Sequence, residues 1–169
     1  KQALREGILM IPKERLFEGI VSTLSVEDNI ALSNAKQMAK GPFVSGAAVR
    51  RQAKHWIGEL RIKTPGPQAL LRQLSGGNQQ KVVFSRALAI LLLNHPTRGV
   101  DVGAKEEIYA LIRDMTDEGK AVIVLGDTTD ECIGLCSRLL VMKDGLVTGE
   151  FDAPADHKPS QVDVVSLMM

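Results

Sequence analysis

The stretch LLLNHPTRGVDVG, residues 91–103, begins as an apolar run and ends at a Pro-Thr-Arg-Gly turn. It predicts a buried strand over Ile90–Leu93, followed by a helix over Ala104–Glu118. Two further β-rich runs follow, over Ala121–Leu125 and Arg138–Lys143. Strands that alternate with helices are typical of βαβ units, so we expect an α/β fold with a mostly parallel sheet.

The chain ahead of this region predicts one more strand and two helices. The strand lies over Ile8–Ile11, and Ser25 is a suitable N-cap for the first helix, with Asp28 as its capping-box partner. Residues 36–46 are small and polar and predict a loop, and a helical period then runs over residues 47–62. This half of the chain is therefore expected to be mainly helical.

One junction between elements is unusual. The predicted helix over Asn78–Leu88 runs into the strand that begins at Ile90 without any turn residue. A helix that feeds a strand usually needs about 2–6 loop residues. Either the helix ends abruptly at Ala89, or several residues are missing between Ala89 and Ile90, and the second explanation is favoured. Further on, Asp144-Gly145 predicts the turn of a hairpin, and a polar segment leads to an apolar tail over Val162–Met169.

The composition excludes several classes of protein. The 169 residues suffice for one domain, and 44% of them are hydrophobic. A net charge of +1 and an aromatic content of 4% speak against nucleic acid as a partner. No apolar run approaches the roughly 18 residues that a membrane span needs, and no signal peptide opens the chain.

The two cysteines, Cys132 and Cys136, are spaced one helical turn apart. This spacing favours buried small apolar residues over a metal or redox site, because no second Cys or His pair accompanies them. We therefore expect a cytosolic protein.

The stretch LSGGNQQK, residues 74–81, carries the most specific chemistry. Ser75 is a suitable N-cap, and Gly76 and Gly77 have no Cβ, so a ligand can approach their backbone closely. The free N–H groups and positive dipole end of a helix form an anion site. The same residues also make an ordinary Ser-Gly-Gly helix start, and the stretch alone does not decide between the two.

The order of motifs resembles the nucleotide-binding domains of ATP-binding-cassette transporters. More narrowly, it resembles the second of two fused cassettes in bacterial importers of simple sugars such as ribose, xylose or galactose. LSGGNQQK is similar to that family's signature motif, and PTRGVDVGAKEEIY, residues 96–109, to its segment after the Walker B strand. GILMIPKERLFEGI, residues 7–20, resembles the Q-loop region, and CIGLCSRLLVMKDGLVTGEF, residues 132–151, the last strand and hairpin. The resemblance covers residues 1–151.

The resemblance implies a P-loop NTPase-like cassette with a mostly parallel sheet and a helical subdomain. The helical subdomain falls at about residues 26–74, the signature, Walker B and C-terminal strands at about 75–151, and a tail at 152–169. The phosphate-cradling motif G-x-x-x-x-G-K-[ST] occurs nowhere in the 169 residues. In the family it lies upstream of the segment that this chain matches, so we expect a partial cassette.

The end of the Walker B strand departs from the family. There the family has an Asp that holds the Mg²⁺ hydration shell and a Glu that polarises the attacking water. Asn94 stands in the first position and His95 in the second. An amide oxygen is a poor substitute for a carboxylate toward Mg²⁺. An imidazole can accept a proton but differs from Glu in reach and shape. We therefore expect a degenerate site, with His95 as the one candidate catalytic base.

The resemblance implies a role in trans for the signature motif. In a cassette pair, each ATP with its Mg²⁺ lies between the P-loop of one cassette and the signature of the other. The implied nucleotide-binding residues are Ser75, Gly76, Gly77, Asn78, Gln79, Asn94 and Asp101. The first three would supply hydrogen-bond donors to a γ-phosphate held by the partner cassette. Asp101 resembles the residue that contacts the partner cassette, and it is also a candidate N-cap for the following helix.

The implied partners are the second cassette, a transmembrane permease and a periplasmic sugar-binding protein. The implied location is peripheral, on the cytoplasmic face of the bacterial membrane. One alternative is a structural cassette half that docks the permease and has no role toward nucleotide. A cassette ATPase of the DNA-repair type is disfavoured, because the chain has no long heptad segment.

Overall fold

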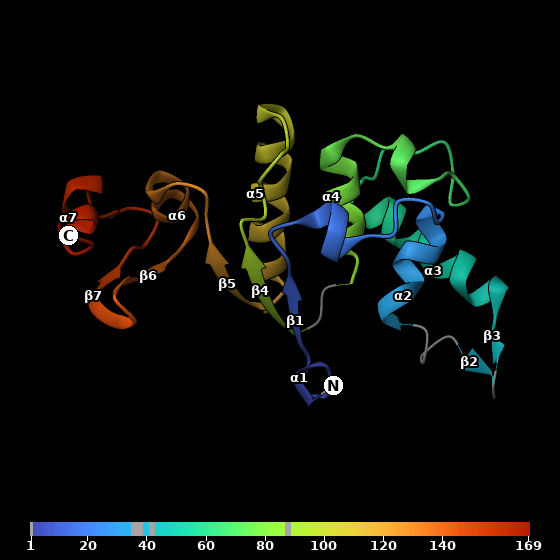
Figure 1. The fold of residues 1–169 in the computed structure, drawn as a ribbon, viewed down its shortest axis with the longest axis horizontal. Coiled ribbons are helices and arrows are strands. Elements are labelled where there is room, and N and C mark those ends of the chain that lie inside the picture. Colours follow the sequence, from blue (N-terminus) through green and yellow to red (C-terminus); the bar gives the residue numbers. More distant parts are fainter. Residues whose placement is uncertain (1, 35–38, 41–42, 87–88) are drawn as a thin grey trace. The chain divides into compact units, whose positions relative to one another are not determined.

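The computed structural model describes residues 2–34, 39–40, 43–86 and 89–169. These residues form two compact units, residues 1–123 and 124–169. The first unit contains the sheet and the helical region, and the second contains a hairpin with two short helices (Figure 1). Among the described residues, no helix is long and apolar enough to cross a membrane.

The sheet of the first unit has the strand order β1-β4-β5. Its strands are β1 (Ile8–Ile11), β4 (Ile90–Asn94) and β5 (Ala121–Leu125). β1 runs parallel to β4 over its whole length, which confirms the predicted parallel pairing. Ile11, Leu91 and Leu93 are buried and anchor the two strands in the core. The sheet therefore follows from the apolar runs that the sequence shows.

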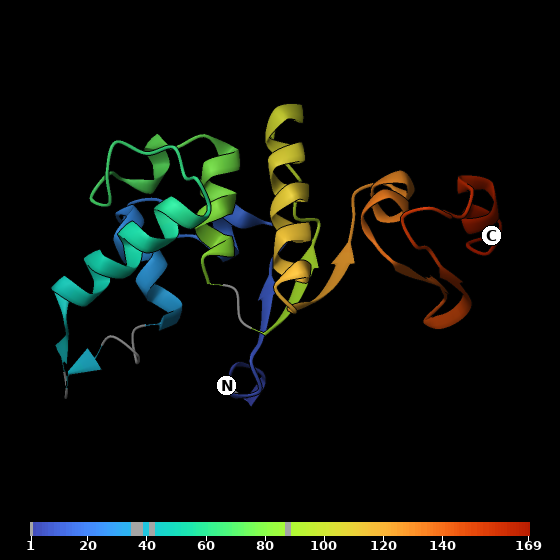
Figure 2. The same cartoon turned by 180° about the vertical axis from the view of Figure 1, so that it is seen from behind.

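Helix α5 (Val102–Asp117) lies alongside this sheet in both views of the chain (Figures 1 and 2). Its buried residues Ile108, Ile112 and Met115 recur at helical spacing on one face. The helix begins two residues earlier than the sequence predicts.

Helix α4 (Gly76–Phe84) also begins two residues earlier than predicted, and it ends four residues before the predicted end at Leu88. Ser85 closes the helix, because its hydroxyl donates to the carbonyl of Val82 at 2.6 Å. Residues 85–89 then connect α4 to β4, although residues 87–88 lie outside the described part. The helix thus ends before the predicted Leu88, and the expectation that residues are missing between Ala89 and Ile90 stays a prediction.

The helical region consists mainly of α2 (Val26–Asn34) and α3 (Gly46–Glu59), which pack on each other. The predicted capping box is confirmed, because the hydroxyl of Ser25 accepts from the backbone N–H of Asp28 at 3.1 Å. The predicted loop over residues 36–46 contains a pair of two-residue antiparallel strands, and its last two residues, Ser45 and Gly46, cap and begin α3. Residues 36–38 and 41–42 are not described. The other elements of this unit are α1 (Gln2–Arg5), the π-helical turn η1 (Arg15–Gly19), β2 (Ala39–Lys40), β3 (Phe43–Val44) and the 3₁₀ turn η2 (Leu71–Gln73).

Asn29 ties the start of the helical region to the end of α4. Its side chain is fully buried, accepts from the N–H of Val21 at 2.9 Å and donates to the carbonyl of Ser25 at 2.9 Å. Its own carbonyl accepts from Arg86 Nε at 3.1 Å, and Arg86 also donates to the carbonyl of Gly19 at 2.5 Å. Burial lowers the pKa of Arg86. These bonds satisfy a buried amide that would otherwise destabilise the fold.

The second unit is built on the antiparallel hairpin of β6 (Arg138–Lys143) and β7 (Leu146–Asp152). The predicted turn is confirmed, since Asp144 and Gly145 adopt φ values of 51° and 82°, as a type I′ turn requires. The core of this unit contains Ile133 of α6 (Thr129–Leu135), Leu139, Val141, Ala153 and Val164 of α7 (Gln161–Ser166).

Helix α7 was not predicted, although its capping signal is present in the sequence. Ser160 accepts from the N–H of Asp163 at 3.2 Å and donates to its carboxylate at 2.6 Å. Cys132 and Cys136 are half-buried and pack against the core of this unit, at α6 and at its C-cap. Burial raises the pKa of both thiols, which agrees with their interpretation as small apolar residues.

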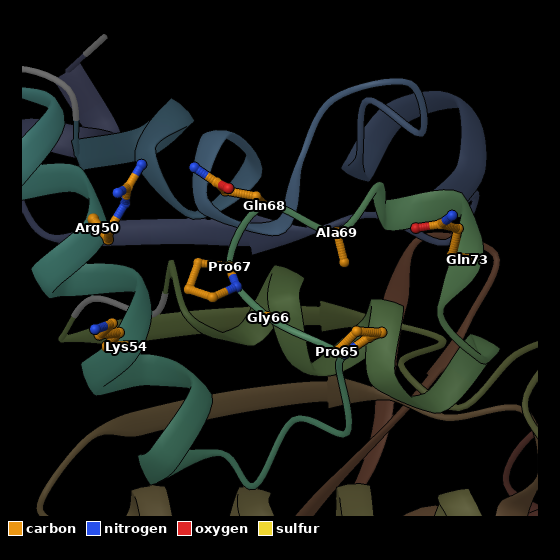
Figure 3. A pocket seen from close by; sticks show the side chains of 8 residues that line it. All are labelled: Arg50, Lys54, Pro65, Gly66, Pro67, Gln68, Ala69 and Gln73. Atoms are coloured by element: carbon orange, nitrogen blue, oxygen red, sulfur yellow. The ribbon is translucent and has the colours of Figure 1, made fainter.

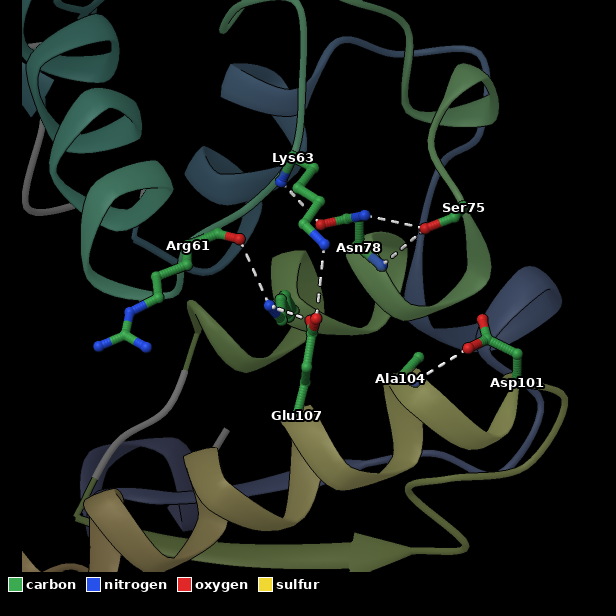
Figure 4. A network of polar contacts seen from close by, with 8 residues as sticks. Arg61, Lys63, Ser75, Asn78, Asp101, Ala104 and Glu107 are labelled. Atoms are coloured by element: carbon green, nitrogen blue, oxygen red, sulfur yellow. Dashed lines mark hydrogen bonds and ion pairs between the residues drawn. The ribbon is translucent and has the colours of Figure 1, made fainter.

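Helices α4 and α5 are joined by a close steric contact and an ion pair. A Cβ on Gly77 would lie 2.6 Å from the Cβ of Ala104, so only glycine allows this approach. One turn further on, Lys81 Nζ lies 2.7 Å from a carboxylate oxygen of Glu107, and Lys63 Nζ lies 3.5 Å from the other (Figure 4). The Lys81 side chain is only 7% exposed, and its hydrogen bond lowers the pKa of Glu107.

We predict that Gly77→Ala destabilises the fold by about 1–3 kcal/mol, although alanine is the better helix former. The methyl group has no rotamer that avoids Ala104, so the two helices must separate. Denaturant unfolding of the whole chain measures the change. Gly58→Ala in α3 is the matched control, because a Cβ there meets nothing within 4 Å. Unchanged stability of the Gly77 variant would contradict the contact.

We also predict that Glu107→Gln lowers the free energy of unfolding by about 1 kcal/mol at pH 7, since Lys81 loses its charged partner. The folded pKa of Glu107 lies below its ordinary value of 4.5. Its contribution is therefore present above that value and is lost as the pH falls through the folded pKa.

Unfolding curves of wild type and variant across pH 3–7 test this sign. The two proteins should differ at neutral pH and converge in acid. Glu106→Gln removes the same charge from the neighbouring position of α5. It should change the free energy of unfolding by less than about 0.5 kcal/mol at both pH 3 and pH 7. A difference that stays constant with pH would contradict the assignment to Glu107.

Candidate functional site

The start of α4 has the geometry of an open helix N-terminus. Ser75 is exposed and caps the helix, as predicted, with its hydroxyl 3.5 Å from the N–H of Asn78. Gly76 and Gly77 occupy the first two helical positions, where no preceding carbonyl is available to their N–H groups. Gly76 is partly exposed, whereas Gly77 is buried against α5. The donors that an anion can reach are therefore the Ser75 hydroxyl and the first backbone N–H groups.

The side chains of Asn78 and Gln79 are bonded to the protein itself. Asn78 Oδ1 accepts from the backbone N–H of Lys63 at 2.7 Å. Gln79 is buried, and its amide donates to the carbonyls of Leu71 at 3.3 Å and Leu74 at 3.1 Å. These two predicted site residues therefore help to build the loop before α4.

Arg15 lies beside the start of α4. Its Nη1 donates to Gln80 Oε1 at 3.2 Å, and its Nη2 would lie 3.2 Å from a Cβ on Gly76. Its Nε is buried and has no hydrogen-bond partner among the described residues. Burial lowers the pKa of the Arg15 guanidinium. A partly desolvated guanidinium thus adds positive charge next to the helix N-terminus. Sequence reasoning missed Arg15, because it is 61 residues from Gly76 and no local pattern marks it.

Gly76 is also crowded on its other side, where a Cβ would lie 3.2 Å from the carbonyl oxygen of Gly99. Any substitution of Gly76 therefore disturbs packing as well as the approach of a ligand. Ser75, which is exposed, is the cleaner position to probe.

Asp101 begins α5 close to the start of α4. Its carboxylate accepts from the N–H of Ala104 at 2.9 Å, which confirms the predicted N-cap (Figure 4). Ala104 in turn faces Gly77. The N-terminal ends of the two helices therefore lie side by side, and each carries an exposed polar cap residue. A contact of Asp101 with a partner cassette stays a prediction.

The predicted Walker B position lies at the carboxyl end of β4. Asn94 is the last residue of the strand and is half-buried. His95 follows in a left-handed conformation, with φ 50°, and its carbonyl accepts from the N–H of Arg98 at 3.1 Å. The described residues contain no group of three or more His, Cys, Asp or Glu side chains that could hold a metal ion. A neutral amide and an imidazole at this strand end do not fit the oxygen-rich shell that Mg²⁺ prefers.

A pocket of about 520 Å³ lies elsewhere in the first unit, between α3 and the loop that precedes η2 (Figure 3). None of the predicted site residues lines it. Its lining residues are Arg50, Lys54, Pro65, Gly66, Pro67, Gln68, Ala69 and Gln73.

The chain matches no protein-family model. It is 40% identical to a ribose import ATP-binding protein of Rubrobacter xylanophilus over 155 residues, which cover 89% of this chain and 30% of that protein. It is 41% identical to an arabinose import ATP-binding protein of Yersinia pestis, again over 155 residues with the same coverage. The chain thus spans about three tenths of the length of these relatives.

Solved structures show the same fold. A dimeric ATP-binding cassette in a post-hydrolysis state, bound to ADP and Pi, superposes with a TM-score of 0.70 at 24% identity. The match covers 90% of this chain and 66% of that cassette. The chain thus has the fold of an ATP-binding cassette, and over most of its length it is similar to part of the ATP-binding proteins named for ribose and arabinose import.

Proposed function

We propose that this chain is part of the ATP-binding subunit of a sugar importer and that it contributes the signature motif to the ATP site of a partner cassette. The relatives named as ribose and arabinose import ATP-binding proteins support the transport role. The open N-terminus of α4, with Ser75 exposed at its tip, is the observation that carries the signature role.

The donors at the start of α4 suit a phosphate. The Ser75 hydroxyl, the N–H groups of Gly76 and Gly77 and the positive end of the helix dipole all favour negative charge. Arg15 adds a cation against the same turn. Such donors are held in place before the ligand arrives, so they stabilise a γ-phosphate without a reorganisation cost.

The second part of the proposal is that this cassette does not activate a water molecule at its own Walker B position. Asn94 lacks the negative charge that Mg²⁺ requires, and His95 stands where the family has the polarising Glu. The partner cassette would then hold the ATP and Mg²⁺. Ser75 and the first N–H groups of α4 would contact that ATP from this chain.

The remaining partners follow from the same family. We propose a transmembrane permease and a periplasmic sugar-binding protein as partners, and a peripheral position on the cytoplasmic face of the membrane. The alternative function is a structural half that docks the permease without contacting nucleotide. The two functions differ in whether the start of α4 matters for ATP hydrolysis.

Ser75→Ala in the assembled importer tests this difference. Loss of one preorganised donor costs about 10²–10³ in rate in other enzymes. Because the backbone donors remain here, we expect ATP turnover per folded molecule to fall at least about tenfold. Ser45→Ala is the matched control, since Ser45 caps α3 by the same hydrogen bond, at 3.4 Å from the N–H of Ala48. Each variant should lose about 1 kcal/mol of stability through its cap. Wild-type turnover of the Ser75 variant would favour the docking function.

His95→Ala tests the proposed degenerate site. We expect transport to stay within about threefold of wild type, whereas loss of a working base costs about 10²–10⁴. Because His95 adopts a left-handed φ, His95→Asn serves as a second variant that tolerates this conformation. A loss of a hundredfold or more in both folded variants would identify His95 as a base.

A further inference from the structure

We infer that Asn78 is a positioning residue, held by the end of α3, which keeps the hydroxyl of Ser75 directed as a hydrogen-bond donor toward an anion. The inference rests on the proposed signature role of Ser75. It assigns to Asn78 an indirect part in that role, in place of a contact with the nucleotide.

The hydrogen-bond directions around Asn78 follow from its two neighbours. The backbone N–H of Lys63 can only donate, so the oxygen Oδ1, at 2.7 Å, must face it. The amide nitrogen Nδ2 then faces Ser75 Oγ at 2.8 Å and donates to it (Figure 4). The side-chain amide of Asn78 is therefore fixed in one orientation, because the Lys63 N–H can act only as a donor.

The consequence falls on the Ser75 hydroxyl. A serine oxygen has two lone pairs and one hydrogen. Asn78 Nδ2 donates to one lone pair, and the N–H of Asn78, at 3.5 Å, approaches from the same side. Both groups are donors, so the hydrogen of the hydroxyl cannot point toward them. Because Ser75 is exposed, that hydrogen is directed outward, where an anion at the start of α4 would accept it.

The position of the Lys63 N–H is itself set by the way α3 ends. Arg61 adopts φ 49°, and the N–H of Ile62 donates back to the carbonyl of Ile57 at 2.9 Å, as in a Schellman motif. A non-glycine residue in this conformation persists only where its surroundings hold it. Lys81 Nζ holds it here, by donating to the carbonyl of Arg61 at 3.3 Å while it also pairs with Glu107.

The same network therefore runs from the end of α3 to the tip of α4. The segment that presents the Lys63 N–H is anchored by the buried Ile62, while the exposed Lys63 ammonium lies 3.5 Å from Glu107 of α5. The direction of the Ser75 hydroxyl thus depends on how the end of α3 sits on α4 and α5. Asn78 is the only side chain that bridges the Lys63 N–H and Ser75 Oγ in the network of Figure 4.

A double-mutant cycle in the intact importer tests this positioning role. The variants are Ser75→Ala, Asn78→Leu, which is close in size and neutral, and the two combined. Loss of one directing hydrogen bond should lower ATP turnover per folded molecule about three- to tenfold in the Asn78 variant. If Asn78 acts only through the hydroxyl, its substitution should change turnover less than about twofold once Ser75 is alanine.

Asp28→Leu is the matched control. Asp28 follows the N-cap Ser25 of α2 by three residues, just as Asn78 follows the N-cap Ser75 of α4. It should lower the melting temperature and leave turnover per folded molecule unchanged. Asn78→Ala, with the same expectations, replaces the leucine variant if that variant does not fold.

Two outcomes would overturn the inference. One is wild-type turnover in the folded Asn78 variants. The other is a loss that multiplies with that of Ser75→Ala, which would show that Asn78 acts independently of the Ser75 hydroxyl. If Ser75→Ala itself has no effect, the proposed signature role fails, so the two failures are distinguishable.

Discussion

The contact between Gly77 and Ala104 is the constraint on which the arrangement of helices α4 and α5 in the first unit depends. A hydrogen atom is all that fits on Gly77, since even a methyl carbon would lie 2.6 Å from the Ala104 Cβ. This approach brings the N-termini of α4 and α5 side by side, with Ser75 capping the first and Asp101 the second. Two positive dipole ends and two exposed caps therefore lie at one edge of the unit, and neither helix alone would provide that combination.

Polar side chains hold the rest of the unit to these two helices. Lys81 and Glu107 lock α4 to α5 one turn beyond the glycine contact, while Arg15 joins η1 to Gln80. Buried or half-buried polar groups such as these are costly unless they are bonded, so each fixes the segments that carry it in one relative position. The segment after β1, the end of α3 and the start of α5 all meet α4 in this way.

The two glycines of the signature stretch have different physical roles. Gly77 is explained by packing alone, because it is buried against Ala104. Gly76 is partly exposed, and a Cβ added to it would lie 3.2 Å both from Arg15 Nη2 and from the carbonyl oxygen of Gly99. Packing therefore explains why residue 77 is glycine, and the proposed anion site concerns the exposed start of the same helix.

The sequence by itself determined the parallel sheet, the helix caps at Ser25, Ser75 and Asp101, and the hairpin turn at Asp144-Gly145, because these depend on local periodicity and on short-range hydrogen bonds. Its resemblance to the cassette family also predicts that Asn94 and His95 stand where that family has two acids. Only the tertiary structure decided that α4 ends at Phe84, that Arg15 lies beside Gly76, and that the Lys63 N–H orients Asn78. The last two rest on groups that meet only when the chain is folded, since Lys63 lies 15 positions from Asn78 and Arg15 lies 61 positions from Gly76, and no local pattern encodes such a meeting. The bonds of Arg86 to Asn29 and Gly19 likewise join the residues after α4 to a distant segment.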